Sequence, residues 1–297
     1  MLLGSVEAGG TKFVCAVGDE NYRVIETVAF KTTTPEETLG QTVAFFKRFK
    51  DLKAIGIGSF GPIEVRKSAP EYGCITKTPK KHWAHVNFVE YIKSHINVPI
   101  YWTTDVNGSA YGEYILSKQE NEKLESIVYF TVGTGVGAGT IIDGKFLGSL
   151  GHAEAGHIRV KRHPKDMSFS GICPYHEDCL EGLVSGPTFE ARLGKSGREV
   201  PFTNPVWGYM AYYIAQAVLD YTLTIRPNQI VFGGGVISET FLDMIRKEFA
   251  DLLNDYVDVP DLKEYLRMPR AEDNGSATIG DFALATKALE NEAVEKL

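Results

Sequence analysis

The stretch GSVEAGGTKFVCAV, residues 4–17, is the best guide to the architecture of this chain. Its apolar residues lie on both sides of the Gly9–Gly10 pair, which predicts two strands joined by a glycine turn. Because glycine has no Cβ, the backbone amides of such a turn can approach a phosphate group closely. A single turn of this kind is more often only a tight hairpin, so its function depends on what else the chain carries.

The second half of the chain repeats this layout. Residues 126–132 predict a strand, TVGTGVG (131–137) a glycine turn, and residues 139–142 a further strand. Such an internal duplication is typical of two-lobed phosphotransferases. Two glycine turns at equivalent places favour phosphate binding over a plain hairpin.

The length of 297 residues leaves room for two lobes of ordinary size. Charged residues gather in KQENEK, residues 118–123, directly after a predicted helix over 107–117. We therefore expect an α/β fold with an N-terminal lobe of residues 1–117 and a C-terminal lobe of residues 118–297. A last amphipathic helix, about 279–297, can pack back on the first lobe.

Composition excludes several classes of protein. With 43% hydrophobic and 23% charged residues the chain is typical of a soluble globular protein, not of a disordered or fibrous one. A net charge of -7 without a basic cluster argues against a nucleic-acid partner. The start MLLGS lacks a basic segment, and the longest uncharged run, residues 127–142, is too short and glycine-rich to cross a membrane. We expect a cytoplasmic protein with no membrane partner.

Asp105 is the candidate catalytic base. It follows a predicted strand over 100–104 and precedes the helix from Asn107, at the sheet edge where ligands of α/β proteins gather. Phosphoryl transfer to a sugar hydroxyl needs a group that orients the hydroxyl and accepts its proton. Alternatively, Asp105 only caps the helix that begins at Asn107.

The segment GHAEAGH, residues 151–157, can present the Glu154 carboxylate and the His157 imidazole to vicinal hydroxyls of one ligand. Close behind lies CPYHEDC, residues 173–179. Together His157, Cys173, His176 and Cys179 form a set that fits tetrahedral zinc with no open position. The alternatives are two free buried thiols or a Cys173–Cys179 disulfide.

The turn GGGV, residues 233–236, lies between a predicted strand at 229–232 and a helix over 239–253. A strand, a glycine turn and a helix form a corner that suits an adenine or ribose. The same glycines would also serve a close packing corner without a ligand.

Together these segments resemble the ROK family of repressors and sugar kinases, and within it the bacterial fructokinases, over nearly the whole chain. The resemblance implies a two-lobed, actin-like ATPase fold of RNase H-like lobes, an ATP-dependent sugar kinase of carbohydrate metabolism, Mg-ATP and structural zinc as cofactors, and a homodimer. The implied substrate is a hexose, D-fructose first and mannose or glucose next, with Asp105 as the base. If zinc is lost, we expect the sugar loop, residues 151–157, to become disordered. The glycine turns are far away in sequence, so we expect them to continue to bind ATP.

The resemblance also assigns the remaining site residues. The implied ATP-binding residues are Gly9, Gly10, Thr11, Lys12, Thr131, Gly133, Thr134, Gly135, Pro187, Gly233, Gly234, Gly235, Val236, Ile237, Ser238 and Glu239. The implied sugar-binding residues are Gly61, Thr104, Asp105, Glu154 and His157. The implied zinc ligands are His157, Cys173, His176 and Cys179.

Three residues depart from the family pattern. Glu7 stands where the first phosphate loop usually begins with Asp, although its longer arm could still meet magnesium through water. Thr104 stands where glucokinases commonly have an Asn that would bind a sugar hydroxyl, which weakens the glucokinase interpretation. His176 replaces one of three cysteines often found in the metal loop, which changes ligand softness but not the number of ligands.

Two other classes compete with the kinase. The DNA-binding repressors of the family carry an N-terminal helix-turn-helix domain, for which a phosphate loop starting at Glu7 leaves no room. A non-catalytic, sugar-responsive module would not need both Asp105 and two glycine turns. These residues favour the kinase.

Overall fold

The computed structural model describes residues 1–271 and 275–295. The chain forms two compact units. The first unit contains residues 1–122, 146–152 and the chain from Arg270 onward, and the second contains residues 123–145 and 153–269.

The first unit is built on a five-stranded sheet of order β3-β2-β1-β4-β7. Its strands are β1 (Leu2–Ala8), β2 (Lys12–Gly18), β3 (Val24–Lys31), β4 (Leu52–Ser59) and β7 (Ile100–Thr104). The first three form an antiparallel meander, and β4 and β7 continue the sheet parallel to β1. The expected strand, glycine turn and strand over residues 4–17 are therefore the centre of this sheet.

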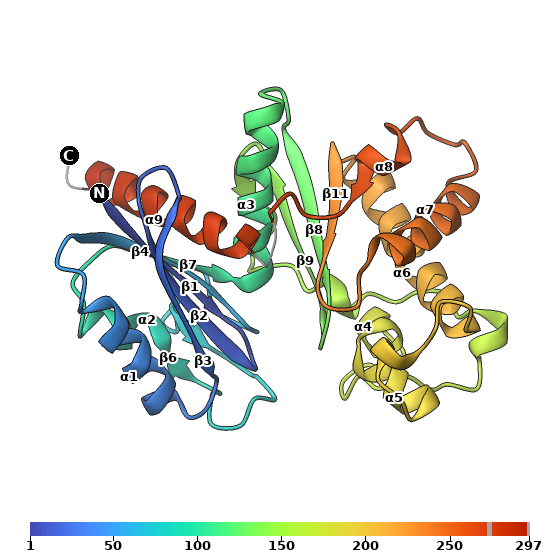
Figure 1. Ribbon diagram of the computed structural model, residues 1–297, viewed down its shortest axis with the longest axis horizontal. Helices are drawn as coiled ribbons and strands as arrows, with labels where there is room; N and C mark the ends of the chain where they lie inside the picture. Colours follow the sequence, from blue (N-terminus) through green and yellow to red (C-terminus); the bar gives the residue numbers. More distant parts are fainter. Residues whose placement is uncertain (272–274, 296–297) are drawn as a thin grey trace. The chain divides into compact units, whose positions relative to one another are not determined.

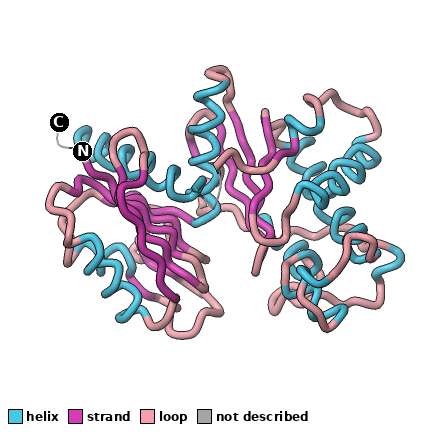
Figure 2. The backbone as a smooth tube through the Cα atoms, viewed as in Figure 1, coloured by secondary structure: helices cyan, strands magenta, loops and turns pink. Residues whose placement is uncertain are grey.

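Helices cover both faces of this sheet (Figures 1 and 2). On one face, α1 (Pro35–Phe46) and α2 (Phe88–Lys93) bury a core with Val6, Phe13 and Trp102. On the other face, α9 (Gly275–Glu295) packs Phe282 and Ala285 against Leu3 and Ala54. A small antiparallel pair, β5 (Cys74–Ile75) and β6 (Val86–Asn87), completes the unit together with α3 (Asp105–Glu120).

Helix α9 lies unusually close to β4 and α3 because glycines remove the side chains between them. A Cβ on Gly56 would lie 1.9 Å from the carbonyl oxygen of Asp281, and one on Gly112 would lie 1.9 Å from that of Ser276. Such separations are possible only for glycine. The close fit places the last helix of the chain in the first unit, although all of residues 123–145 and 153–269 intervene.

The second unit contains a sheet of the same plan, in the order β10-β9-β8-β11-β12. Its strands are β8 (Ser126–Val132), β9 (Val136–Ile142), β10 (Lys145–Phe146), β11 (Gln229–Gly233) and β12 (Leu266–Arg267). Strands β8 and β9 are antiparallel, and β11 and β12 extend the sheet in parallel. Counted within each five-stranded sheet, both sheets thus pair their strands in the order third, second, first, fourth and fifth, as the duplicated layout predicts.

Two long helices carry the core of the second unit. They are α6 (Pro205–Thr224), which starts at an Asn204 cap, and α7 (Glu239–Leu253), which starts at a Ser238 cap. Phe130 and Phe232 of the sheet, and Phe241 of α7 itself, are completely or almost completely buried in this core. The shorter elements are α4 (Leu180–Val184), α5 (Pro187–Leu193), α8 (Leu262–Tyr265), η1 (Ala155–His157), η2 (Pro164–Asp166) and η3 (Gly197–Glu199).

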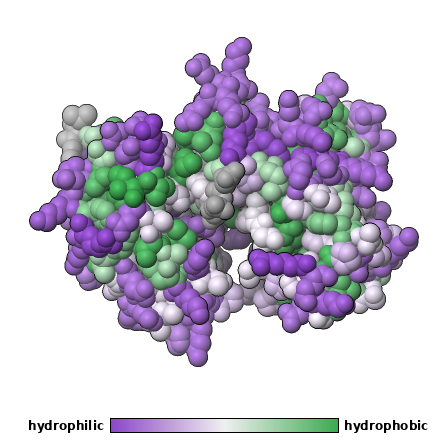
Figure 3. All heavy atoms as spheres, viewed as in Figure 1, coloured by the Kyte–Doolittle hydropathy of each residue, from purple (hydrophilic) through white to green (hydrophobic). Residues whose placement is uncertain are grey.

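Hydrophilic residues cover much of the viewed surface, with smaller apolar areas between them (Figure 3). Within residues 1–271 and 275–295, the structure has no helix with the length and apolarity to span a membrane.

Candidate active site and metal centre

The first glycine turn joins β1 to β2. The amide of Gly9 donates to the carbonyl of Lys12 at 3.0 Å, and the Thr32 hydroxyl donates to the carbonyl of Gly9 at 2.7 Å. A Cβ on Gly9 would lie 2.7 Å from the Lys12 oxygen, whereas a Cβ on Gly10 would meet nothing within 4 Å. The turn is therefore braced on one side and open at Gly10, where a phosphate group could approach.

Asp105 is the first residue of α3. The cap of this helix is Thr104, whose hydroxyl accepts a hydrogen bond from the amide of Asn107 at 3.3 Å. The alternative that Asp105 itself caps the helix from Asn107 is therefore wrong, because the helix begins two residues earlier than the sequence suggests. Asp105 is half-buried, and its Oδ1 accepts from the amide of Val106 at 2.9 Å. This bond holds the carboxylate at the end of β7.

A third carboxyl group, Asp281 of α9, lies behind Glu7 and Asp105. Its side chain is buried, and the Ser5 hydroxyl donates to its Oδ2 at 3.1 Å. Burial and the nearby Glu7 carboxylate raise the pKa of Asp281 well above its ordinary value, and Asp105 adds to the increase. Asp281 was not among the residues predicted from the sequence, although an acid between Gly280 and Phe282 interrupts an apolar helix face and could have marked it.

The second glycine turn joins β8 to β9. The amide of Gly133 donates to the carbonyl of Gly135 at 2.9 Å, which closes the turn. The amide of Val136 donates to Oε2 of Glu181 at 3.0 Å, and the amide of Gly186 donates to the carbonyl of Gly133 at 2.7 Å. Glu181, which lies two residues after Cys179, was also not among the residues predicted from the sequence.

The predicted nucleoside corner, residues 233–236, adjoins this turn. Gly234 has a φ of +95°, and a Cβ there would lie 2.4 Å from the carbonyl oxygen of Val132, so only glycine fits. The amide of Val236 donates to the same carbonyl at 3.0 Å. A Cβ on Gly133 would lie 3.7 Å from the amide nitrogen of Gly235. The structure thus brings the predicted phosphate turn and nucleoside turn together within the second unit.

The other predicted nucleotide residues lie around these turns. Pro187 opens α5 directly after Gly186, Ser238 caps α7, and Glu239 pairs with Arg246 at 2.6 Å. Thr134 is exposed at the tip of the second turn, and Thr11 and Lys12 are exposed beside the first.

The four predicted metal ligands form one cluster. The ligand atoms of His157, Cys173, His176 and Cys179 all lie within 4.8 Å of one another. Nδ1 of His157 is 3.5 Å from Sγ of Cys179 and 3.7 Å from Sγ of Cys173. Ligands at about 2.0–2.3 Å from a tetrahedral zinc are about 3.5 Å apart, so the set fits this ion.

Both cysteines of the cluster are free thiols, so the alternative of a disulfide does not describe this structure. Burial raises the pKa of the Cys179 thiol to about 11. A metal would therefore displace protons from this cluster when it binds, because thiolates are the ligands.

The predicted sugar residues are divided between the two units. Gly61, Thr104 and Asp105 belong to the first unit, and Glu154 and His157 to the second. Glu154 is exposed just before η1. His157 turns its Nδ1 toward the cluster sulfurs, which leaves Nε2 as the atom for any sugar contact.

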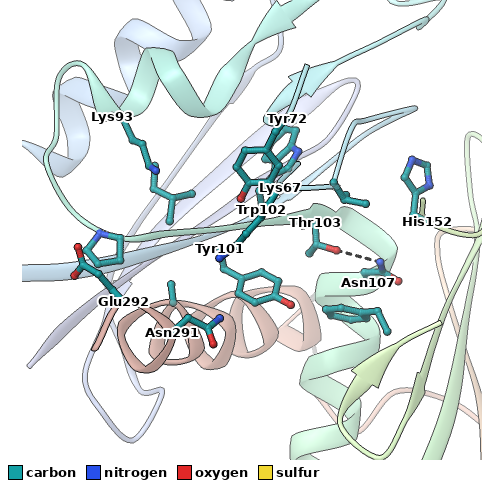
Figure 4. Close-up of a pocket in the computed structure, with 15 residues that line it drawn as sticks. Lys67, Tyr72, Lys93, Tyr101, Trp102, Thr103, Asn107, His152, Asn291 and Glu292 are labelled. Atoms are coloured by element: carbon teal, nitrogen blue, oxygen red, sulfur yellow. Dashed lines mark hydrogen bonds between the residues drawn. The ribbon is translucent and has the colours of Figure 1, made fainter. Parts of the chain in front are cut away.

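A separate cavity of about 550 Å³ lies in the first unit, along the edge strand β7. Tyr101, Thr103, Asn107 and His152 are among the residues that line it, and Asn107 donates to the Thr103 hydroxyl at 3.0 Å (Figure 4). None of the predicted ATP, sugar or metal residues is part of its lining, so we assign the chemistry to the glycine turns and Asp105 instead.

The sequence pattern of the ROK family matches residues 3–288. The chain is similar to two fructokinases. That of Streptococcus mutans serotype c is 53% identical over 290 residues, which cover 96% of this chain and 98% of the relative. That of Lactococcus lactis subsp. cremoris is 47% identical over 284 residues, which cover 95% and 96%.

Solved structures show the same fold. The ROK hexokinase from Thermus thermophilus matches with a TM-score of 0.78 at 20% identity, over 98% of this chain and 100% of that one. A ROK family glucokinase from Streptomyces griseus, in complex with glucose and AMPPNP, matches with a TM-score of 0.73 at 25% identity, over 97% and 100%. The predicted actin-like α/β fold is confirmed, and the chain belongs to the ROK family.

Proposed function

We propose that this protein transfers the γ-phosphoryl group of Mg-ATP to D-fructose and forms D-fructose 6-phosphate. The observation that carries this proposal is full-length similarity, at 53% and 47% identity, to two proteins known as fructokinases. Mannose and glucose are the next candidate substrates, since glucokinases share the family.

The two glycine turns would hold the phosphates of ATP. Both turns leave backbone close to open space, at Gly10 in the first and around the exposed Thr134 in the second. The neighbouring turn of Gly233, Gly234 and Gly235 supports a nucleoside site in the second unit. Magnesium would supply positive charge to the phosphate oxygens, as in other phosphoryl transfers.

Asp105 would orient the sugar hydroxyl and accept its proton while the bond to phosphorus forms. Its place at the start of α3 suits this role, because the bond from the Val106 amide to Oδ1 fixes the carboxylate. A positioned carboxylate limits the movements that would misalign the attacking oxygen.

Gly61, Thr104, Glu154 and His157 would contact the other sugar hydroxyls. The side chain of Thr104 already accepts from the amide of Asn107, and it lacks the amide group by which an Asn could bind glucose. This difference favours fructose over glucose, because a missing hydrogen-bond partner discriminates strongly between related substrates.

The test is a comparison of kcat/KM for fructose, mannose and glucose with purified protein and Mg-ATP. We expect fructose to exceed glucose by about tenfold or more, the scale of a lost polar contact. Equal values for the three sugars would contradict fructose as the preferred substrate, and no transfer to any hexose would contradict the kinase.

We also propose that the cluster of His157, Cys173, His176 and Cys179 holds one structural zinc ion per chain. The separations of the four ligand atoms support this ion. Elemental analysis should find about one zinc per chain, and Cys179→Ser should lower this content and weaken sugar binding. Active protein without zinc would contradict the assignment.

The homodimer stays a prediction, which light scattering of the purified protein can check.

A further inference from the structure

The segments that carry the predicted metal ligands contact the second glycine turn, although they are far apart from it in sequence. Val136, the first residue of β9, is contacted by two residues from outside its hairpin. Its amide donates to Oε2 of Glu181 at 3.0 Å. Its carbonyl oxygen lies against Gly156, where a Cβ would come within 1.9 Å.

Both residues that contact Val136, Gly156 and Glu181, lie one or two positions from a predicted metal ligand. Gly156 precedes His157 in η1, so the histidine and the contact to Val136 belong to one short turn. Glu181 lies in α4, whose cap residue is Cys179. Cys179 and His157 are themselves 3.5 Å apart, between Sγ and Nδ1.

Helix α4 also fits tightly onto the metal loop. A Cβ on Gly182 would lie 1.9 Å from the carbonyl oxygen of Glu177, and the amide of Ile172 donates to the carbonyl of Gly182 at 3.1 Å. At its other end the chain continues to Gly186, whose amide donates to the carbonyl of Gly133 in the glycine turn. Helix α4 and the residues after it thus connect the metal loop to the glycine turn.

We propose that Glu181 is a positioning residue through which the metal cluster holds the second glycine turn in the shape that binds the phosphates of ATP. The inference rests on the proposed ATP and zinc sites, and it assigns the metal a role in nucleotide binding besides its role in the sugar loop. It replaces the expectation that the second glycine turn keeps its hold on ATP when zinc is lost, because Glu181 and Gly156 contact that turn at Val136. A bound ion fixes His157 and Cys179 relative to each other, and Gly156 and Glu181 carry this arrangement to Val136.

The test measures equilibrium binding of Mg-AMPPNP to the full chain without any sugar. Removing the metal from the wild-type protein with a chelator should weaken AMPPNP binding about tenfold, and adding zinc back should restore it. Glu181→Ala should weaken AMPPNP binding about tenfold and leave the zinc content unchanged. The Val136 amide would lose its acceptor, Oε2 of Glu181, so the turn could rearrange. Glu181→Gln keeps an acceptor for the Val136 amide and should stay within about threefold of wild type. Glu190→Ala, at an exposed glutamate of α5, is the matched control and should change nothing.

Two effects that act through one path are not additive. Metal removal should therefore weaken AMPPNP binding by less than threefold in Glu181→Ala. Full additivity, or an Ala variant that loses only fructose affinity, would overturn the inference. If Glu181→Ala does not fold, chelation of the wild-type protein decides, and unchanged AMPPNP affinity would overturn the inference. A wild-type protein that binds AMPPNP but phosphorylates no hexose would contradict the proposed function and leave this inference standing.

Discussion

The two glycine turns share a layout but differ in what supports them. The first is braced by the backbone of Lys12 and the hydroxyl of Thr32, both from its own antiparallel meander. The second depends on Glu181 and on the loop before Pro187, which lie outside its hairpin. Duplication of a strand, a turn and a strand therefore preserves the backbone plan, while the side chains around each copy set its dependence on other parts of the unit.

The largest expected effect is a loss of kcat when Asp105, the candidate base in the same unit as the first turn, is replaced. Asp105→Asn should lower kcat about 100-fold or more and leave AMPPNP affinity nearly unchanged, because the amide keeps an acceptor for Val106 but is a poor base. Steady-state kinetics and equilibrium binding measure the two quantities. Glu122→Gln, at an exposed residue beyond α3, is the control. Near-normal turnover in Asp105→Asn would contradict its role as the base.

The next effect tests whether the sugar residues act apart from the turns. Glu154→Ala should raise the KM for sugar about tenfold or more and change the KM for ATP less than threefold, because it removes hydroxyl contacts and leaves both turns intact. Kinetics with each substrate varied in turn measure this difference. An equal rise in both KM values would instead indicate collapse of the loop that also carries His157.

A pair of glycine variants separates a phosphate turn from a plain hairpin. Gly10→Ala should leave thermal stability unchanged, because its Cβ meets nothing within 4 Å, and should weaken ATP binding about tenfold by occupying the open side. Gly9→Ala should destabilise the fold by about 1–3 kcal/mol, because its Cβ would lie 2.7 Å from a backbone oxygen. Thermal unfolding and AMPPNP binding check both. Normal ATP binding by Gly10→Ala would favour the plain hairpin.

The smallest effect concerns the buried acid behind the first turn. The raised pKa of Asp281 means that the folded protein holds a proton there which the unfolded chain releases above a pH of about 4. Stability is therefore lost as the pH rises toward the folded-state pKa.

Asp281→Asn cannot ionise, so it should escape this loss. Its unfolding midpoint should match that of wild type near pH 4 and exceed it by about 2–4 °C near pH 8. Asp251→Asn, at an exposed position of α7, should follow the wild-type profile. A constant difference between Asp281→Asn and wild type across this pH range would show that Asp281 does not titrate in this way.

Local sequence was sufficient to predict the elements that depend on neighbouring residues. The strand over 126–132 and the helix over 239–253 match β8 and α7, because apolar runs and capping residues act within a few positions. The four cluster ligands could also be predicted, since metal-binding residue types recur at short spacings whatever the fold around them.

Contacts between distant residues were decided only by the tertiary structure. Ser5 and Asp281 are 276 positions apart, and Val136 and Glu181 are 45 apart, so no local periodicity connects either pair. Close packing at Gly56 and Gly112 brings α9 to the first unit, and contacts at Gly156 and Gly182 bring the metal loop to the second turn. The sequence alone identified the segments that are candidates for binding phosphate and metal. Tertiary packing decided which of these segments contact one another, because their backbones can approach closely only where glycine leaves room for them.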